Sequence, residues 1–266
     1  MSQDLLTAID GAVARITFNR PQARNAVNSG MLAVMHQFLQ SIEDDRQVRC
    51  IVIGGAGDHF MAGGDVIGFK EALEKPSAER RAEFEARVQS AAPLFVQMAR
   101  MPQPIVARVQ GAAAGAAVGF VAGADIAICG ASSIFVVAHV NIGVSPDGST
   151  SYYLPRSIGV RKAKELAILG EKINAQEALA LGLVNRVVPD AELDQAIAAV
   201  VDKIVNAPAT SVRRAKLLMQ ESLGNTLERQ LQLEAESFAE CAATDDFVEG
   251  VSAFAQKRKA VFNRGG

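Results

Sequence analysis

Residues 106–128, VARVQGAAAGAAVGFVAGADIAI, decide the fold expected for this chain. An apolar, β-prone run leads into a turn at Gln110-Gly111, and a second apolar run closes the segment. The Gly and Ala residues between these runs leave one face almost without side chains, so another backbone or a ligand can approach closely. If a helix begins near Ala116, its first N–H groups lack intrahelical partners and point outward as donors. Such donors can stabilise an oxyanion. The same composition is also typical of a tightly packed helix of small residues in an α/β core, so both interpretations stay open.

A second Gly-rich loop favours the oxyanion interpretation. The stretch GGAGDHFMAGGD at 54–65 follows the apolar run 50–53, so the order of strand, Gly-rich loop and helix start occurs again, with Asp65 placed as an N-cap. Its glycines are not in register with the dinucleotide-binding pattern G-x-G-x-x-G before a helix. Two loops that each aim one N–H group at the same point would form a two-donor oxyanion hole.

Five segments resemble the enoyl-CoA hydratase/isomerase (crotonase) superfamily, in order along nearly the whole chain. They are FNRPQARNAVN (18–28), FMAGGDV (60–66), VQGAAAGAAVGFVAGADIAI (109–128), the long stretch from GVSPDGS to GLVNRVV (143–188) and EGVSAFAQKRKAVF (249–262). The resemblance implies an acyl-CoA thioester substrate, no further cofactor, and an oxyanion hole formed by the N–H groups of Gly64 and Ala116. It also implies an α/β fold: a spiral of ββα turns over residues 1–205, then a helical region over 206–266 that assembles a homotrimer or a dimer of trimers.

Composition argues against several other classes of protein. The chain has 266 residues, 49% of them hydrophobic, and a formal charge of −2, so it has no general electrostatic footprint for nucleic acid. Cys50, Cys129 and Cys241 are interpreted as reduced thiols of a cytoplasmic protein rather than a disulfide framework. No Cys/His cluster has metal-ligand spacing, and no segment is typical of a signal peptide or a membrane span. We therefore expect no metal, no nucleic-acid partner and no membrane partner.

Hydrophobic periodicity and turn signals predict most of the secondary structure. The predicted elements are a hairpin over 4–18 around Asp10-Gly11, a helix over 30–46 capped at Asn28-Ser29, a strand over 48–54, a helical stretch from 76 to 100, a strand over 134–137, helices over 160–169, 175–181 and 190–206, and three more helices within 208–259.

The resemblance also implies which residues bind coenzyme A. Arg24 precedes Asn-Ala at a position where the family has a basic contact to CoA, and Ala62 and Asp65 belong to the first oxyanion loop. Phe254 and Lys257 match positions where the C-terminal helix reaches the adenine and the phosphates. From the residues alone, Arg24 is equally a solvated loop cation, Phe254 a packing residue and Lys257 a surface lysine.

The family pattern is broken at the catalytic positions. Typical hydratases carry one glutamate after the second Gly-rich loop and another after the next strand, where this chain has Gly119 and His139. Water addition by two carboxylates is therefore not supported, whereas the oxyanion hole uses backbone and survives the changes. Asp147, in the turn signal Pro-Asp-Gly, aligns with an aspartate of isomerase-type members and with the nucleophile of the 4-chlorobenzoyl-CoA dehalogenase.

The rest of the dehalogenase site is absent, because Gly64, Ala92 and His139 stand where that enzyme has an aromatic residue, histidine and tryptophan. One carboxylate beside an oxyanion hole suits an enoyl-CoA isomerase, in which Asp147 moves a proton between two carbons. Two alternatives stay open: a hydratase (a lyase) that uses Asp147 or His139 in place of the glutamates, and a catalytically inactive CoA-thioester-binding protein. From the residues alone, Asp147 is also a turn or N-cap residue, with Ser149 or Thr150 available as the cap instead. His139 is also a hydrogen-bonded histidine at a strand end, and Asp125, between apolar runs, is interpreted as structural.

Overall fold

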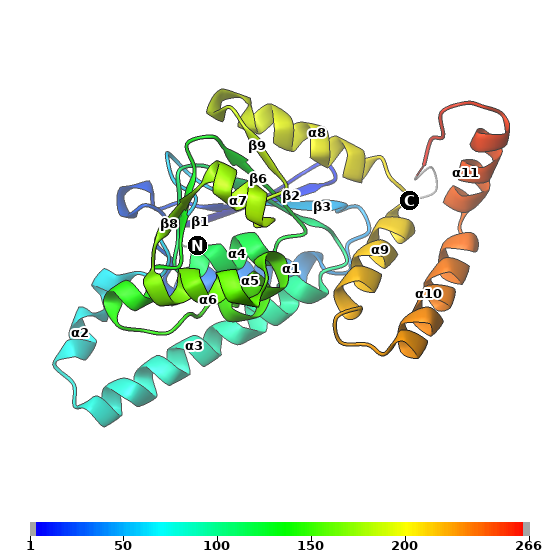
Figure 1. The fold of residues 1–266 in the computed structure, drawn as a ribbon. Coiled ribbons are helices and arrows are strands. Elements are labelled where there is room, and N and C mark those ends of the chain that lie inside the picture. The colour runs from blue at the N-terminus through cyan, green and yellow to red at the C-terminus, as the bar shows by residue number, and fades with distance from the viewer. Residues whose placement is uncertain (1–3, 263–266) are drawn as a thin grey trace.

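Two sheets wrapped by helices form the body of the computed structural model, which describes residues 4–262 (Figure 1). The larger sheet has the order β1-β2-β3-β4-β6-β9, with β1 Leu5–Asp10, β2 Val13–Phe18, β3 Cys50–Gly55, β4 Ile105–Val109, β6 Ile126–Gly130 and β9 Arg186–Val188. Strands β1 and β2 form the predicted antiparallel hairpin, and every other neighbouring pair is parallel. The smaller sheet has the order β5-β7-β8, with β5 Ala112–Ala114, β7 Ile134–Val136 and β8 Lys172–Asn174.

Helices cover both faces of the larger sheet. The α-helices are α1 Ser29–Ile42, α2 Lys70–Leu73, α3 Ser77–Arg100, α4 Ala116–Gly123, α5 Thr150–Ile158, α6 Val160–Leu169, α7 Ala175–Leu181, α8 Leu193–Val205, α9 Ala209–Glu221, α10 Leu227–Ala242 and α11 Asp245–Ala255; four short 3₁₀ helices are η1 Pro21–Ala23, η2 Val66–Phe69, η3 Ala138–Ile142 and η4 Asp190–Glu192. Because strand side chains alternate between faces, Val52 and Val106 pack against α8, while Ile51 and Ile105 pack in the core formed with α1, α3 and α4. This burial of both faces is typical of parallel sheets.

The elements predicted from local patterns are confirmed closely. Helices α6 and α7 have the predicted bounds, and the region 208–259 contains α9, α10 and α11. Helix α1 ends at Ile42 rather than near residue 46, and the stretch 190–206 divides into η4 and α8. The Asn28 side chain accepts a hydrogen bond from the Met31 N–H at 2.9 Å and caps α1 as expected.

Helices α9, α10 and α11 form an arm that projects from one side of the core (Figure 1). Asp125 connects the arm to the sheet, since its Oδ2 accepts from the Ile105 N–H at 2.7 Å and lies 2.8 Å from the Lys216 Nζ of α9. Lys216 also donates to the Gln103 carbonyl at 3.1 Å. Asp125 is therefore structural, as the sequence indicates. The two predicted regions, 1–205 and 206–266, include residues 1–3 and 263–266, which lie outside the described part of the chain.

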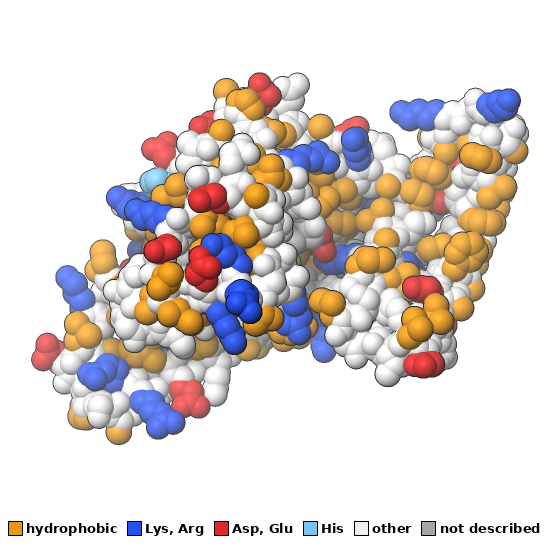
Figure 2. All heavy atoms as spheres, in the orientation of Figure 1, with side chains coloured by type: hydrophobic (Ala, Val, Ile, Leu, Met, Phe, Trp, Pro, Cys, Tyr) orange, Lys and Arg blue, Asp and Glu red, His pale blue; other side chains and the backbone are white. Residues whose placement is uncertain are grey.

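Many apolar side chains of the arm are exposed. They are Met219, Leu223, Leu227, Leu231, Phe238, Phe247, Val248, Val251 and Phe254. Figure 2 shows such hydrophobic side chains gathered along the arm. None of the helices within residues 4–262 combines the length and the apolar composition needed to cross a membrane.

We expect Asp125→Ala to lower the free energy of unfolding by about 2–3 kcal/mol, because it leaves the 10% exposed Lys216 ammonium without its ion-pair partner and the Ile105 N–H without its acceptor. Asp194→Ala is the matched control: that carboxylate, 81% exposed, pairs with Arg108, and its loss should cost less than about 1 kcal/mol. Urea unfolding followed by circular dichroism measures both. Equal losses in the two variants would contradict the assigned role of Asp125.

Candidate active site

The two Gly-rich loops meet along a short backbone ladder. The Met61 N–H donates to the Ala112 carbonyl at 3.1 Å, and the Ala114 N–H donates back to the Met61 carbonyl at 3.0 Å. A Cβ atom at Gly63, which has φ 84°, would lie 2.9 Å from the Ala114 carbonyl oxygen. Only glycine tolerates both this φ angle and this approach, so the residue type at 63 brings the loops together.

Where the loops meet, two backbone donors have no partner within the described part of the chain. The neighbours of Gly64 are engaged, since Val27 donates to the Gly63 carbonyl at 2.8 Å and accepts from the Asp65 N–H at 2.9 Å. Helix α4 begins at Ala116, as predicted, after Gly115 has taken a φ of 57°. Among the described residues, no group accepts a hydrogen bond from the N–H of Gly64 or of Ala116. Both N–H groups are therefore available to an oxygen atom of a ligand.

Asp65 holds the first loop in place. Its Oδ2 lies 2.8 Å from Arg20 Nη1, and its Oδ1 accepts from the Gly68 N–H at 3.3 Å, which confirms the predicted cap, here of η2. The hydrogen bond from Arg20 holds the pKa of Asp65 below its usual value, so this carboxylate is ionised at neutral pH. Both of its oxygens are thus engaged within the protein. In the same loop, the Ala62 N–H is also engaged, since it donates to the Arg24 carbonyl at 2.9 Å.

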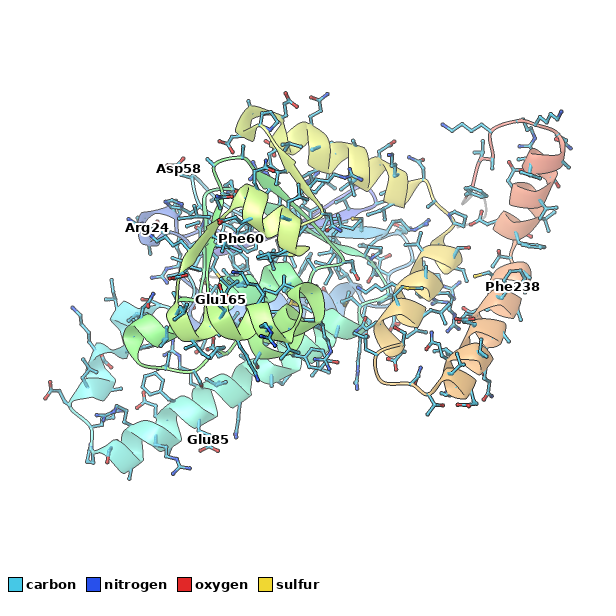
Figure 3. The ribbon with its side chains drawn as sticks, in the orientation of Figure 1. Arg24, Asp58, Phe60, Glu85, Glu165 and Phe238 are labelled. Atoms are coloured by element: carbon cyan, nitrogen blue, oxygen red, sulfur yellow. The ribbon has the colours of Figure 1, made fainter. Side chains whose placement is uncertain are left out.

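The residues implied to bind CoA fall into two separated groups. Arg24 is exposed at the edge of the core, near the first Gly-rich loop, whereas α11 lies at the far end of the molecule (Figures 1 and 3). Phe254 is 87% exposed on α11, and Lys257 follows that helix. One chain therefore does not bring Phe254 and Lys257 to the loop that contains Gly64.

His139 and Asp147, both expected from the sequence, are in contact. His139 lies in η3, directly after the smaller sheet's middle strand β7, and its Nε2 is 3.0 Å from Asp147 Oδ1. The same Nε2 lies 3.3 Å from the Asp147 backbone nitrogen. The His139 side chain is 7% exposed and that of Asp147 43%. A Cβ atom at Gly115 would lie 3.9 Å from His139 Nε2, so the pair adjoins the residue before the Ala116 donor.

Gly119 shows why no carboxylate projects from helix α4. A Cβ atom at Gly119 would collide with the Gly148 carbonyl oxygen and lie 2.9 Å from the Thr150 nitrogen. A Cβ atom at Gly148 (φ 58°) would in turn lie 2.7 Å from the Ala116 Cβ. The turn at 147–150 therefore packs directly on α4, in the space that a side chain at 119 would need. This contact was not predicted, because each glycine looks ordinary without its counterpart.

The expectation that a Ser149 or Thr150 hydroxyl caps helix α5 is wrong. Ser149 is the N-cap residue, but it has φ 63° and makes no side-chain cap hydrogen bond, since its hydroxyl donates to the Gly148 carbonyl. Asp147 does not cap the helix with its side chain either, and only its carbonyl accepts from the Thr150 N–H at 3.0 Å. The Asp147 carboxylate is therefore available for another role. Across residues 4–262, no group of three or more His, Cys, Asp or Glu side chains is arranged to hold a metal ion.

Known proteins resemble this chain over nearly its whole length. A family model described as enoyl-CoA hydratase/isomerase matches residues 8–265. The chain belongs to the enoyl-CoA hydratase/isomerase family. It is 31% identical to 1,2-epoxyphenylacetyl-CoA isomerase of Escherichia coli, over 98% of this chain and 99% of the relative. It is 33% identical to crotonyl-CoA hydratase of Syntrophomonas wolfei, over 98% of both chains.

Solved structures of this family have the same fold. The crystal structure of enoyl-CoA hydratase from Mycobacterium smegmatis matches with a TM-score of 0.88 and 33% identity, over 97% of this chain and 98% of that one. The expected crotonase-like α/β fold is therefore confirmed. Membership of the family indicates the general class of reaction. It does not decide between hydration and isomerisation, because the relatives include a hydratase and an isomerase.

We expect Gly119→Ala to lower the free energy of unfolding by about 1–3 kcal/mol, because the added Cβ displaces the turn at Gly148. Gly224→Ala is the control, since its Cβ would meet nothing nearer than 3.8 Å and the site is exposed, so its effect should stay within about 0.5 kcal/mol. Thermal and urea unfolding of the two variants measure the difference. A Gly119→Ala protein as stable as the unmodified chain would show that the turn does not press on α4.

Proposed function

We propose that the protein is an enoyl-CoA isomerase that shifts a C=C bond of an acyl-CoA thioester through an enolate. The observation that carries this proposal is a single carboxylate, Asp147, beside two unpartnered N–H groups, in a site where backbone fills the space of the second carboxylate at Gly119. Water addition in this family's typical form needs a pair of carboxylates to position water and move protons. A double-bond shift needs only one group that accepts a proton and returns it.

The thioester oxygen is proposed to bind between the N–H groups of Gly64 and Ala116. Two fixed donors make the α-proton acidic, because the negative charge that develops on the oxygen is stabilised before the proton leaves. The exposed Arg24 side chain is proposed to contact the phosphates of CoA, together with the backbone of Ala62. Asp65 acts through its ion pair with Arg20, which keeps the first loop in shape.

The proposed proton transfer involves Asp147 alone. Its ionised carboxylate takes a proton from C2 of a 3-enoyl thioester, and the electrons of the broken C–H bond enter a dienolate whose oxygen lies in the oxyanion hole. The protonated carboxyl group then gives the proton to C4. The carbonyl forms again and the C=C bond now joins C2 and C3, so no water is consumed or released.

A reducing compartment suits the cysteines. All three are free, and burial raises the pKa of Cys50 to about 12 and that of Cys129 to about 11, so both remain uncharged thiols. These features support the proposed cytoplasmic location.

We expect Asp147→Asn to lower kcat for isomerisation by at least about 10² to 10⁴, since the amide cannot accept the proton, with KM changed less than about threefold. The assay uses 2-enoyl and 3-enoyl thioesters of several chain lengths, with the products separated and weighed by mass spectrometry. Asp58→Asn, the same change at an exposed position of the first loop, is the control and should behave as the unmodified enzyme (Figure 3).

Two results would contradict the proposal. A product that gains water, with no double-bond shift, would identify a hydratase that uses Asp147 or His139 in place of the glutamates. Binding of every thioester without turnover would identify a CoA-thioester-binding protein. The relatives include proteins with each of the two enzymatic names, so the product decides between them.

We also propose that the chain assembles as a trimer or a dimer of trimers through residues 206–266. The exposed apolar side chains of the arm support this, because contiguous apolar surface of this kind marks protein contacts. Phe254 and Lys257 lie far from the chain's own first loop, so their proposed contact with CoA is to the site of another copy (Figure 1).

Sedimentation of the full chain should give the mass of three or six copies. Phe238→Glu places a charge on a 72% exposed apolar position of α10 and should dissociate the assembly. Glu85→Gln on α3, at the other end of the molecule, is the control and should leave the mass unchanged (Figure 3). A monomeric unmodified chain would overturn the assembly.

A further inference from the structure

His139 is buried beside the proposed acid/base, and one of its ring nitrogens has no partner among residues 4–262. Nε2 makes two contacts with Asp147: it lies 3.0 Å from the carboxylate Oδ1 and 3.3 Å from the backbone nitrogen. Nδ1 is buried and, among the residues that the structure describes, finds no hydrogen-bond partner. Asp147 Oδ2 likewise has no hydrogen-bond partner within residues 4–262, and its side chain is partly exposed.

The two tautomers of a neutral His139 ring differ sharply in this setting. With the proton on Nε2, the ring donates to the ionised Oδ1, a charge-assisted bond that is roughly twice as strong as a neutral one. This tautomer leaves the Nδ1 lone pair unpaired and gives up the 3.3 Å hydrogen bond from the Asp147 N–H to Nε2. With the proton on Nδ1, a buried donor is orphaned and the Nε2 lone pair faces a carboxylate oxygen at 3.0 Å. In that second tautomer Nε2 can accept the 3.3 Å hydrogen bond from the Asp147 N–H. This longer bond does not compensate for the unpaired Nδ1–H and for the repulsion between the Nε2 lone pair and the carboxylate. The hydrogen-bond network therefore assigns the proton to Nε2.

The backbone of the turn and the side chain of Asp147 are held by different contacts. Gly119 and Gly148 let the turn pack on α4, which fixes the Asp147 backbone. A carboxylate still rotates about its last bond, whose preference is broad and two-fold. Among the contacts of the described residues, the hydrogen bond with His139 restrains this rotation. The same ring lies beside Gly115, the residue before the Ala116 donor.

We propose that His139 is a positioning residue: its Nε2–H holds Oδ1 of Asp147, so that Oδ2 alone takes the substrate proton and returns it. This rests on the proposed role of Asp147 as the acid/base. No proton passes through the imidazole, because Oδ1 accepts the same hydrogen bond whether Oδ2 is ionised or protonated. The proton that leaves C2 stays on Oδ2 and is delivered to C4 of the same acyl chain.

Three variants of His139 test the hydrogen bond. In His139→Gln the amide nitrogen lies near the position of Nε2 and can donate, whereas His139→Leu has similar bulk and no donor. We expect kcat of His139→Leu to fall about 10²-fold with KM within about threefold, and His139→Gln to recover most of kcat. His139→Asn, whose shorter amide does not reach Oδ1, should resemble His139→Leu, and it replaces that variant if the leucine protein does not fold.

Stability and isotope transfer separate positioning from packing. The melting temperature of His139→Leu should change by only a few degrees, because the lost hydrogen bond to the 43% exposed Asp147 carboxylate is offset by removal of the buried Nδ1, which has no partner among the described residues. With a 3-enoyl thioester deuterated at C2, in ordinary water, the unmodified enzyme should carry deuterium to C4. His139→Leu should carry a smaller fraction, since a freely rotating carboxyl group exchanges its proton with water.

The outcomes distinguish this inference from the proposed function. If Asp147→Asn abolishes isomerisation but His139→Leu keeps kcat and deuterium transfer near the unmodified values, the positioning role is wrong and the isomerase stands. Equal kcat for His139→Gln and His139→Leu would also overturn the positioning role. If Asp147→Asn itself isomerises normally, the proposed role of Asp147 is wrong, and the positioning role of His139 is wrong with it.

Discussion

The close approach of two backbones, 61–64 and 112–116, is the constraint on which the candidate site depends. At Gly63 any side chain would press on the Ala114 carbonyl oxygen. Behind this contact, the buried Phe18 ring packs edge-on against Phe60 of the first loop and against Phe120 of α4, with centroids 5.9 and 5.6 Å apart. Strand β2, the loop and α4 are thereby packed into one core. The two N–H donors are positioned by this packing and not by their own side chains.

Because the two donors are backbone groups, the oxyanion hole that we propose for them is compatible with different side-chain acids and bases. In this chain the carboxylate that we propose as the acid/base does not come from α4. Gly119 instead lets the turn at 147–150 lie on that helix, and the turn carries Asp147. The identity of residue 119 therefore has a chemical consequence although glycine has no reactive group: it determines which segment of the chain reaches the site.

Local physical rules explain why so much of the fold was predictable. The N-caps at Asn28 and Asp65, and helices α6 and α7, depend on residues within about four positions of each other, so their signals are contained in short stretches of sequence. The start of α4 at Ala116 is of the same kind, since Gly115 can take the φ of 57° that precedes the helix. The cap of α5 shows the limit, because Ser149 takes a φ of 63° in the turn that packs on α4, and its hydroxyl donates to the neighbouring Gly148 carbonyl and not to the helix.

The sequence by itself determined the family, the class of fold, the two Gly-rich loops and the short list of candidate side chains, because motifs and periodicity are local. Only the tertiary structure decided that His139 contacts Asp147, that Gly119 faces Gly148, and that the arm with Phe254 lies away from the first loop (Figure 1). Each of these depends on segments that are distant along the chain yet adjacent in space. Gly119, for example, lacks a side chain where the backbone of Gly148 lies, and the residues near each glycine in the sequence do not indicate this contact.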